Sequence, residues 1–555
     1  MARSNPEGHD LIAMAAGVVE VLEALLADAT AKVRARVAIG GRTVTRLLNR
    51  EQRAAHGLAW LATYVEAIRQ LAAYAQRIHA AGNLGEVEDL VIRIGLGEYL
   101  AQIFGGIPMS QGEIARPADF GLSRADLSPR MTAFVETLIA SGNTAQRRAR
   151  LVELLRAQRE ATPGMSGLDD NLEAIRDEMR KFAVSEVTQQ AQRWHLSNSY
   201  VPLAIVAQMS ELGVFGLTIP EEFGGMGLGK QAMCVVSEEL SRGYIAVGSL
   251  GTRAEIAAEL ILHGGSEEQK RRWLPKIADG SILPAVAATE PASGSDLASI
   301  RTRAVRDGNL YKVRGSKTWI THAARADLLV LLVRTNPKET GHRGLSILLA
   351  EKPRGSDDKP FPAAGITGSE IPVLGYRGMK QFEIVFDEFE VPASGLLGDV
   401  EGAGFKQLMR TFETARIQTA ARAVGVAQSA LDQAIGYSGQ RTQFGVPIAD
   451  FPRVGDKIAM MAAEIAIARQ LTHFAARKKD AGGRCDLEAA MSKLLAARVA
   501  WAAADNAVQI HGANGLALEF PVSRLLCDAR ALGILEGPAE ILTQVIARRL
   551  LDGSE

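Results

Sequence analysis

The chain has 555 residues, enough for several domains, and 47% of them are hydrophobic. Lysine plus arginine equals aspartate plus glutamate, 63 each, so no net charge draws the chain to nucleic acid or to an acidic membrane. The three cysteines, Cys234, Cys485 and Cys527, form no metal-binding or disulfide pattern. No window of the sequence reads as a membrane span, and the first residues lack the apolar core of a signal peptide. We therefore expect a cytoplasmic protein without a metal.

Residues 10–165 are predicted to be helical almost throughout. Apolar residues from Leu58 to Ile78 recur every three and four positions, which is typical of an amphipathic helix. The runs Leu11–Leu26 and Val87–Phe104 are apolar nearly all round, so we expect buried helices of a bundle. Thr162–Gly167 reads as a linker into the next unit.

The pattern changes twice in the remainder of the chain. Residues 168–280 read as helices, interrupted by the glycine-rich stretch Phe223–Gly229. Short apolar runs separated by Gly and Pro then follow from Ile282 to Phe386 and predict an antiparallel sheet or barrel. From Gly402 to Leu551 the helical period returns.

The stretch Gly533–Ile541 reads as a turn between two of these last helices. Pro538 suits a first helical position, and Glu540 then falls in the first turn, where the helix dipole favours negative charge. Glu536 lies on the turn beside Ile534 and Leu535. A carboxylate in apolar company is a candidate general base because loss of solvation makes it a stronger base, whereas a lone loop glutamate is more often a solvated surface group.

Three other stretches carry polar groups that suit a cofactor. Thr289–Asp296 follows an apolar strand and gathers hydroxyl and backbone N–H groups, as a phosphate or a polar ring requires, although plain turns have the same composition. Trp319 and Thr321 would share one face of a strand, offering a ring to stack on and a hydroxyl, or forming an ordinary half-buried strand. Arg441 suits a pyrophosphate, or is a surface arginine.

Together with other motifs, these stretches resemble the acyl-CoA dehydrogenase family of flavoproteins over about residues 170–551. The matching motifs occur in the family's order: Pro220–Gly225, Thr289–Asp296, Trp319–Thr321, Phe386–Gly398, Arg441–Gly445, Gln509–Gly512 and Glu536–Gly537. The resemblance implies an α+β, mostly α fold with a helical domain, a central antiparallel β-domain and a C-terminal four-helix bundle. We expect the boundaries 1–167 for an extra N-terminal helical block, then 168–283, 284–398 and 399–555 for those three domains.

The resemblance also implies an enzyme that uses FAD to oxidise an acyl-CoA thioester. Glu536 matches the base that removes the α-proton while the β-hydrogen leaves as hydride to flavin N5, and its backbone N–H would help bind the thioester carbonyl. Implied FAD contacts are Thr289, Gly294, Ser295, Trp319, Thr321 and Glu540, with Arg441, Gln443, Phe444, Gln509 and Ala513 reaching the FAD of a neighbouring subunit. The family implies a homodimer or homotetramer and an electron-transfer flavoprotein as electron acceptor.

Some positions depart from the family pattern. Certain relatives carry the base on an earlier helix, where this chain has Ala415, so Glu536 is the remaining candidate. Several substitutions each put one FAD hydrogen bond in doubt: Ala292 and Ala513 for glycines, His322 for asparagine, Pro538 for threonine and Phe451-Pro452 for Phe-Gln.

The acyl group is predicted from the helix that floors the family's acyl pocket. Ser249, Thr252 and Arg253 lie there, while Ser295, Phe412, Glu413 and Arg416 match positions along the bound thioester and its CoA arm. A buried arginine suits an acyl group that ends in a carboxylate, as in glutaryl-CoA dehydrogenases; the alternative is an arginine that points to solvent.

The N-terminal block of about 170 residues narrows the range of expected substrates. Such a block resembles that of relatives that oxidise a short branched dicarboxylic acyl-CoA. The motif Gln102–Gly106 echoes Gln509–Ala513, which indicates a duplicated bundle or a chance match. A short-chain or glutaryl-CoA type dehydrogenase, an acyl-CoA oxidase and a DNA-associated flavin-binding relative remain alternatives, the last opposed by the balanced charge.

Overall fold

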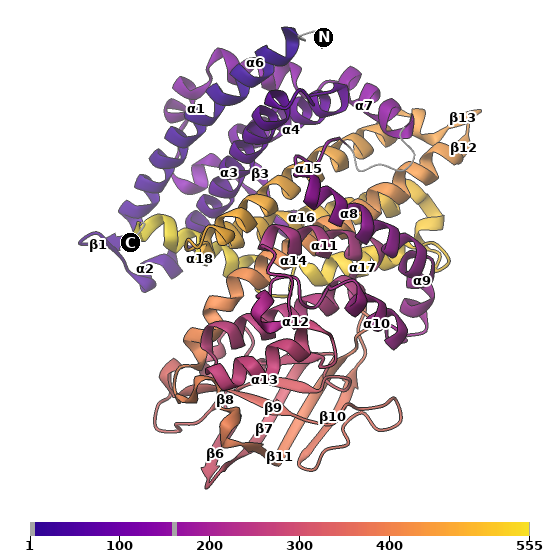
Figure 1. The fold of residues 1–555 in the computed structure, drawn as a ribbon. Helices are drawn as coiled ribbons and strands as arrows, with labels where there is room; N and C mark the ends of the chain where they lie inside the picture. The colour runs from indigo at the N-terminus through magenta and orange to yellow at the C-terminus, as the bar shows by residue number, and fades with distance from the viewer. Residues whose placement is uncertain (1–5, 158–163, 554–555) are drawn as a thin grey trace. The chain divides into compact units, whose positions relative to one another are not determined.

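The computed structural model describes residues 6–157 and 164–553. It divides into two compact units, one formed by Met1–Ala174 with Thr419–Glu555 and the other by Ile175–Gln418. Helix α14 (Gly404–Gln440) begins in the second unit and ends in the first. Figure 1 shows the path of the chain through these elements.

The N-terminal segment of the first unit is helical, as its sequence predicts. The amphipathic run Leu58–Ile78 lies in the long helix α3, and the predicted apolar runs lie in α1 and α4. Two short hairpins, β1–β2 and β3–β4, interrupt the helices. The bounds are α1 (Pro6–Val37), β1 (Ala38–Ile39), β2 (Arg42–Thr43), α2 (Thr45–Arg50), α3 (Gln52–Ala80), α4 (Glu86–Gly105), β3 (Ile107–Pro108), β4 (Ile114–Ala115), α5 (Arg124–Leu127), α6 (Ala133–Ser141) and α7 (Ala145–Ala157).

The C-terminal segment supplies the other helices of this unit. They are α15 (Pro452–Asp480), α16 (Asp486–His511), α17 (Val522–Leu532) and α18 (Ala539–Asp552), with a small hairpin of β12 (Thr442–Gln443) and β13 (Val446–Pro447) after α14. Helix α15 packs on α3, α4 and α7, and α18 packs on α3 (Figure 1). The N-terminal block therefore shares one core with the C-terminal helices.

Polar contacts join the two segments as well. Arg34 of α1 donates through Nε to the carbonyl of Leu551 at 2.8 Å and so satisfies one of the carbonyls that the end of α18 leaves without a helical partner. The side chain of Arg498 in α16 is only 9% exposed, pairs with Glu464 of α15 and donates to the Tyr99 hydroxyl of α4 at 3.1 Å. Because a buried guanidinium is costly without such partners, this triad fixes the three helices together.

The second unit begins with helices and continues into a sheet. The helices are α8 (Asp170–Phe182), a π-helical stretch (Ala183–Thr188), α9 (Gln189–Leu196), α10 (Leu203–Glu211), α11 (Lys230–Gly243), α12 (Ile245–Gly264) and α13 (Glu267–Ala278). The glycine-rich stretch Phe223–Gly229 separates α10 from α11, as expected. Helix α12 is buried at nearly every position, including Ser249 and Thr252.

The sheet of this unit has seven strands in the order β10-β11-β7-β6-β8-β5, with β9 also paired to β8. Strand β8 reads Leu-Leu-Val-Leu-Leu-Val-Arg and is buried at all seven positions, as a strand covered on both faces requires. Most pairs are antiparallel, as expected, and two further pairs, β5 with β8 and β6 with β8, are parallel. The strands are β5 (Pro284–Ala287), β6 (Arg303–Asp307), β7 (Leu310–Thr321), β8 (Leu328–Arg334), β9 (Leu345–Glu351), β10 (Ile366–Ile371) and β11 (Gln381–Pro392).

Two of the sequence expectations concern segment boundaries. Thr162 and Pro163 of the predicted linker lie outside the described residues, and Gly164–Gly167 form neither helix nor strand. The four-domain boundaries stay a prediction.

Among the described helices, none is both long and apolar enough to cross a membrane.

Candidate active site

The turn that carries Glu536 joins α17 to α18. Glu536 is half-buried and has a positive φ of 55°, and Gly537 follows with φ 104°. Two consecutive left-handed residues reverse the chain sharply, and the second of them needs glycine because a side chain is strained there. The N–H groups of Ile534 and Leu535 close the end of α17 by donating to the Ala531 carbonyl.

A buried lysine holds this turn from the side of α16. Lys493 is 1% exposed, and its Nζ donates to the carbonyl oxygen of Gly537 at 2.7 Å. A charge-assisted hydrogen bond of this kind is stronger than a neutral one. Lys493 was not among the residues singled out in the sequence, although a lone lysine inside the apolar run Ala489–Ala497 was an available signal.

The start of α18 differs slightly from the expectation. Pro538 is the N-cap residue, with φ −66° and ψ 165°, and Ala539 is the first helical residue, so the predicted position of the proline was one residue too far into the helix. Glu540 lies in the first turn, as predicted, and its side chain is exposed. A proline at the N-cap removes only an N–H that the helix would not use.

In the second unit, Thr289–Asp296 forms a tight turn after β5. Glu290 and Ser293 exchange two backbone hydrogen bonds of 3.0 Å, and the Thr318 N–H of β7 donates to the Thr289 carbonyl at 2.9 Å. Gly294 and Ser295 are exposed, and a Cβ on Gly294 would meet only the Thr289 methyl, at 3.8 Å. The surface beside Thr289 is therefore open.

A buried ion pair supports this turn from below. Lys317 Nζ donates to Glu290 Oε1 at 2.9 Å and to the Ala288 carbonyl at 2.8 Å. Burial lowers the pKa of Lys317 to about 8, opposed by the charge of Glu290. Burial alone would raise the pKa of Glu290, but Lys317 and the donors of Thr302 and Arg301 lower it below its usual value, so the pair stays ionised at neutral pH.

Trp319 lies in a β-bulge of β7. Its φ is 59°, and the register with β11 shifts by one residue between Phe382 and Ile384. The Trp319 side chain is 56% exposed, whereas Thr321 is buried and donates to Gln381 Oε1 at 2.8 Å. Trp319 and Thr321 were expected on one face of the strand because side chains alternate along a regular strand. The bulge interrupts this alternation and turns the indole outward.

His322 follows the bulge and is buried. Its φ is 64°, and its ring packs edge-on against Tyr200 with centroids 6.0 Å apart. Burial lowers the pKa of His322 to about 3, with the nearby Arg325 charge acting in the same direction. The imidazole is therefore neutral at physiological pH.

The β12–β13 hairpin of the first unit presents Arg441, Gln443 and Phe444 at the surface. Phe444 sits at the tip with φ 51° and is 95% exposed, its ring edge-on to Phe451 at 6.0 Å. An aromatic side chain left this open in one protomer fits contact with another molecule.

The end of α16 lies beside this hairpin. Tyr437, one turn before Arg441, stacks on His511 at 4.0 Å between centroids, and Asn514 donates to the Tyr437 hydroxyl at 3.0 Å. Gln509 and Ala513 are exposed on either side of His511. The structure therefore brings together the residues that the sequence assigns to a neighbour's FAD.

Arg253 of α12 is buried, with 9% of its surface exposed. The alternative of an arginine pointing into solvent is therefore wrong. Ser249 and Thr252 are fully buried on the same helix, and Thr252 Oγ1 donates to the Gly248 carbonyl at 3.3 Å. A guanidinium held in such a place needs an anionic or polar partner.

Helix α14 carries the residues predicted for the CoA arm. The Arg416 guanidinium lies 5.9 Å from the centre of the Phe412 ring one turn earlier, and Glu413 in the same turn is half-buried. Ala415 is fully buried and has no ionisable group. This helix therefore offers no second base at that position.

The predicted site residues thus fall into two groups. Glu536, Glu540 and the residues around Arg441 and Gln509 belong to the first unit, and the Thr289–Thr321 residues, Arg253 and the α14 residues belong to the second. Part of the second group fits a flavin, because the exposed Trp319 indole follows Thr318, whose N–H donates to Thr289, and Ser295 of the same turn is exposed.

Profiles of one family match most of the chain. The N-terminal domain of acyl-CoA dehydrogenases matches residues 169–281, the middle domain 285–389 and the C-terminal domain 402–551. The chain belongs to the acyl-CoA dehydrogenase family, whose members are FAD-dependent oxidoreductases.

Individual members of the family and related solved structures are similar to this chain to different extents. The (2S)-methylsuccinyl-CoA dehydrogenase of Cereibacter sphaeroides is 58% identical over 544 residues, 98% of each chain. A solved glutaryl-CoA dehydrogenase in complex with glutaryl-CoA is 36% identical, with a TM-score of 0.64 over 68% of this chain and 95% of that one. A chain from a study of the electron transferring flavoprotein of Acidaminococcus fermentans is 33% identical, with a TM-score of 0.66 over 69% and 98%.

Proposed function

We propose that this protein oxidises (2S)-methylsuccinyl-CoA to mesaconyl-CoA, with Glu536 as the base. The observation that carries the proposal is the 58% identity that extends over 98% of the chain and so includes the N-terminal block. The family profiles begin at residue 169 and so leave that block unmatched, and the glutaryl-CoA dehydrogenase covers only 68% of the chain.

In the proposed reaction, the Glu536 carboxylate removes the proton from the carbon next to the thioester carbonyl. FAD held by the Thr289 turn and Trp319 would supply the acceptor for the β-hydrogen and its electron pair, so that the Cα–Cβ bond becomes a double bond. Glu536 is half-buried and fixed by the left-handed turn, and Lys493 holds the next carbonyl. A base held in advance loses little entropy in reaching the transition state.

The backbone N–H of Glu536 serves as a donor to the thioester oxygen in this proposal. Negative charge develops on that oxygen as the α-proton leaves, and a donor fixed beforehand stabilises it without reorganisation. Gly537 permits this geometry because its φ of 104° keeps the chain turning away after Glu536.

Arg253 is proposed to pair with the distal carboxylate of the acyl group. Its burial on α12, the helix that matches the pocket floor, supports this role. A charge-assisted contact of this kind favours acyl groups that end in a carboxylate, because an acyl group that ends in a methyl group cannot accept a hydrogen bond from the guanidinium.

Two partners belong to the same proposal. The exposed Phe444 and the adjacent Arg441, Gln443, Gln509 and Ala513 would meet the FAD of a second subunit in a homodimer or homotetramer. An electron-transfer flavoprotein is proposed as the electron acceptor, supported by the likeness to the Acidaminococcus fermentans chain.

The base assignment is tested with Glu536→Gln, which keeps the size of the side chain and removes its basicity. Turnover should fall by about two to four orders of magnitude while FAD stays bound. Glu519→Gln, an exposed glutamate of the same unit, is the control and should keep normal turnover. A Glu536→Gln enzyme with near-normal turnover would rule out the role.

The substrate is tested by following flavin bleaching with methylsuccinyl-CoA, glutaryl-CoA and butyryl-CoA under anaerobic conditions. We expect the highest kcat/KM with methylsuccinyl-CoA. Preference for butyryl-CoA would refute the dicarboxylic assignment, and rapid peroxide formation in air would point to an oxidase instead.

A further inference from the structure

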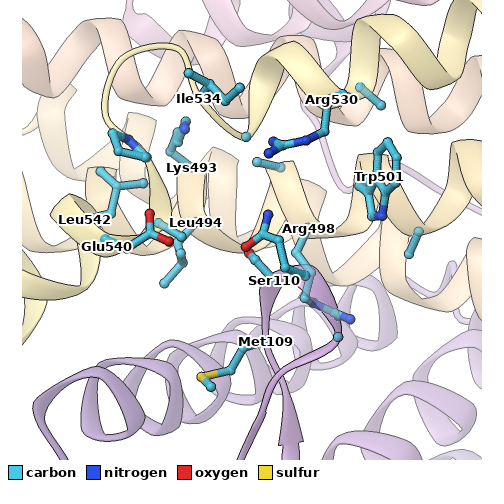
Figure 2. Close-up of a pocket in the computed structure, with 18 residues that line it drawn as sticks. Met109, Ser110, Lys493, Leu494, Arg498, Trp501, Arg530, Ile534, Glu540 and Leu542 are labelled. Atoms are coloured by element: carbon cyan, nitrogen blue, oxygen red, sulfur yellow. The ribbon is translucent and has the colours of Figure 1, made fainter. Parts of the chain in front are cut away.

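A cavity of about 470 Å³ lies within the first unit, next to the Glu536 turn (Figure 2). One wall is the tip of the β3–β4 hairpin, Met109–Gly112, and the facing walls come from α16, the end of α17 and the start of α18. Ile534 and Pro538, on both sides of Glu536, line it. Its volume lies in the range of small-molecule sites. We call it the hairpin cavity.

The hairpin tip has a defined shape. Gln111 and Gly112 have positive φ angles of 56° and 76°, and the Met109 N–H donates to the Glu113 carbonyl at 2.8 Å. A non-glycine residue in the left-handed region stores strain and is often found where a tip meets a ligand. The wall that the tip forms is thus a turn with two left-handed residues.

The charged groups of the hairpin cavity favour an anion. Within the described part of the chain, no carboxylate lies within ion-pair distance of Arg530, whereas Arg498 is neutralised by Glu464 and Lys493 donates to the Gly537 carbonyl. Figure 2 shows Arg530 reaching from α17 into the space between Lys493 and Trp501. Glu540 is the one carboxylate that the described lining contributes.

The remaining walls limit the anion to one with an apolar body. Leu494, Ala497 and Leu542 line the cavity beside Met109, and the Trp501 indole, 39% exposed, offers a flat face. A polyanion would place charge against these side chains and against Glu540, at a high desolvation cost. A small molecule with one carboxylate and a hydrocarbon body fits this cavity, because the carboxylate can pair with the Arg530 guanidinium and the body can contact the apolar walls.

We propose that the hairpin cavity binds a small monocarboxylate and that its occupancy changes the rate of the reaction at the Glu536 turn. The carboxylate would pair with Arg530, and the body would lie between Leu494 and Ile534. Because Ile534 and Pro538 belong both to the cavity and to the turn, a bound acid restricts the turn. The binding claim is independent of the proposed substrate; the rate claim rests on Glu536 as the base.

Binding is tested by calorimetry on the FAD-loaded enzyme without acyl-CoA, with hexanoate as probe and hexanamide as its uncharged match. Hexanoate should bind, and hexanamide should bind about 10- to 100-fold more weakly, because a hydrogen bond to a charged group is lost. The Arg530→Gln substitution should weaken the binding of hexanoate by the same factor. Arg548→Gln, an exposed arginine of α18 outside the cavity, should leave binding unchanged.

A second variant tests whether the two probes occupy the hairpin cavity. Ala502→Leu adds bulk to the cavity wall and should weaken the binding of hexanoate and of hexanamide alike. Hexanoate should also lower kcat without raising the KM of the acyl-CoA.

The proposal is overturned if hexanoate does not bind, if Arg530→Gln binds it as wild type does, or if hexanoate competes with the acyl-CoA. It is also overturned if Arg530→Gln loses its FAD, because the cavity would then belong to the flavin site. An enzyme that binds hexanoate but does not oxidise methylsuccinyl-CoA would refute the proposed substrate alone.

Discussion

Replacing Lys493 with methionine should slow the chemical step without emptying the flavin site. The change removes the ammonium that donates to the Gly537 carbonyl at 2.7 Å and keeps most of the side-chain volume. A hydrogen bond from a charged group contributes roughly 1.5–3 kcal/mol, and about 1.4 kcal/mol corresponds to a factor of ten. If that energy holds the turn in its productive form, the rate of flavin reduction should fall about 10- to 100-fold.

The measurement is the rate of flavin bleaching in a stopped-flow half-reaction, together with the flavin-to-protein ratio and the melting temperature. Lys352→Met is the matched control, because Lys352 is also buried and donates to the carbonyls of Ala324 and Ala326, at 3.1 and 2.6 Å, in the other unit. Both variants should lose stability, but only Lys493→Met should slow bleaching per bound flavin. Equal bleaching rates in the two variants would refute the positioning role.

Three further predictions concern the second unit and the exposed hairpin. Arg253→Gln should lower kcat/KM for methylsuccinyl-CoA by about 10- to 100-fold and change that for butyryl-CoA little; equal losses in a steady-state assay would contradict the carboxylate contact. The folded pKa of His322 is about 3 against 6.5 unfolded, so the unfolded chain binds the extra proton between these values and stability falls as pH drops through that window. His322→Asn should remove about 2 kcal/mol of the stability difference between pH 7 and pH 5 in urea titrations, and an unchanged difference would argue against a buried neutral imidazole. Phe444→Ala should lower the flavin-to-protein ratio of the purified enzyme; a full complement of FAD would exclude the contact with a neighbour's flavin.

The helical elements could be predicted because their signals are local. Leu58–Ile78 places apolar residues on one face wherever the helix packs, and α3 contains all of it. The turn between α17 and α18 was also predicted, since Gly533 and Pro538 mark its ends. Glu536 could be named as a candidate base for the same reason.

Features that depend on distant residues could not be predicted. Trp319 follows an alternating strand in the sequence, and its outward position comes from a bulge opposite β11, more than sixty residues later. Lys493 lies in an apolar helix, and its role appears only when α16 meets the Gly537 carbonyl. The periodicity of the N-terminal helices shows that one face is buried but not that α15 and α18 cover it.

The shared core of the N-terminal block and the C-terminal helices has a consequence for how the chain folds. The 244 residues from 175 to 418 separate its two halves in the sequence. At roughly 5–20 residues per second, a ribosome needs about 12–50 s to make that stretch, during which the faces of α3 and α4 that pack on α15 have no partner. Residues 175–418 can fold as a unit in that time, so the helices made first complete their packing last. We therefore expect newly made chains, rather than finished enzyme, to depend on chaperones that shield apolar helices.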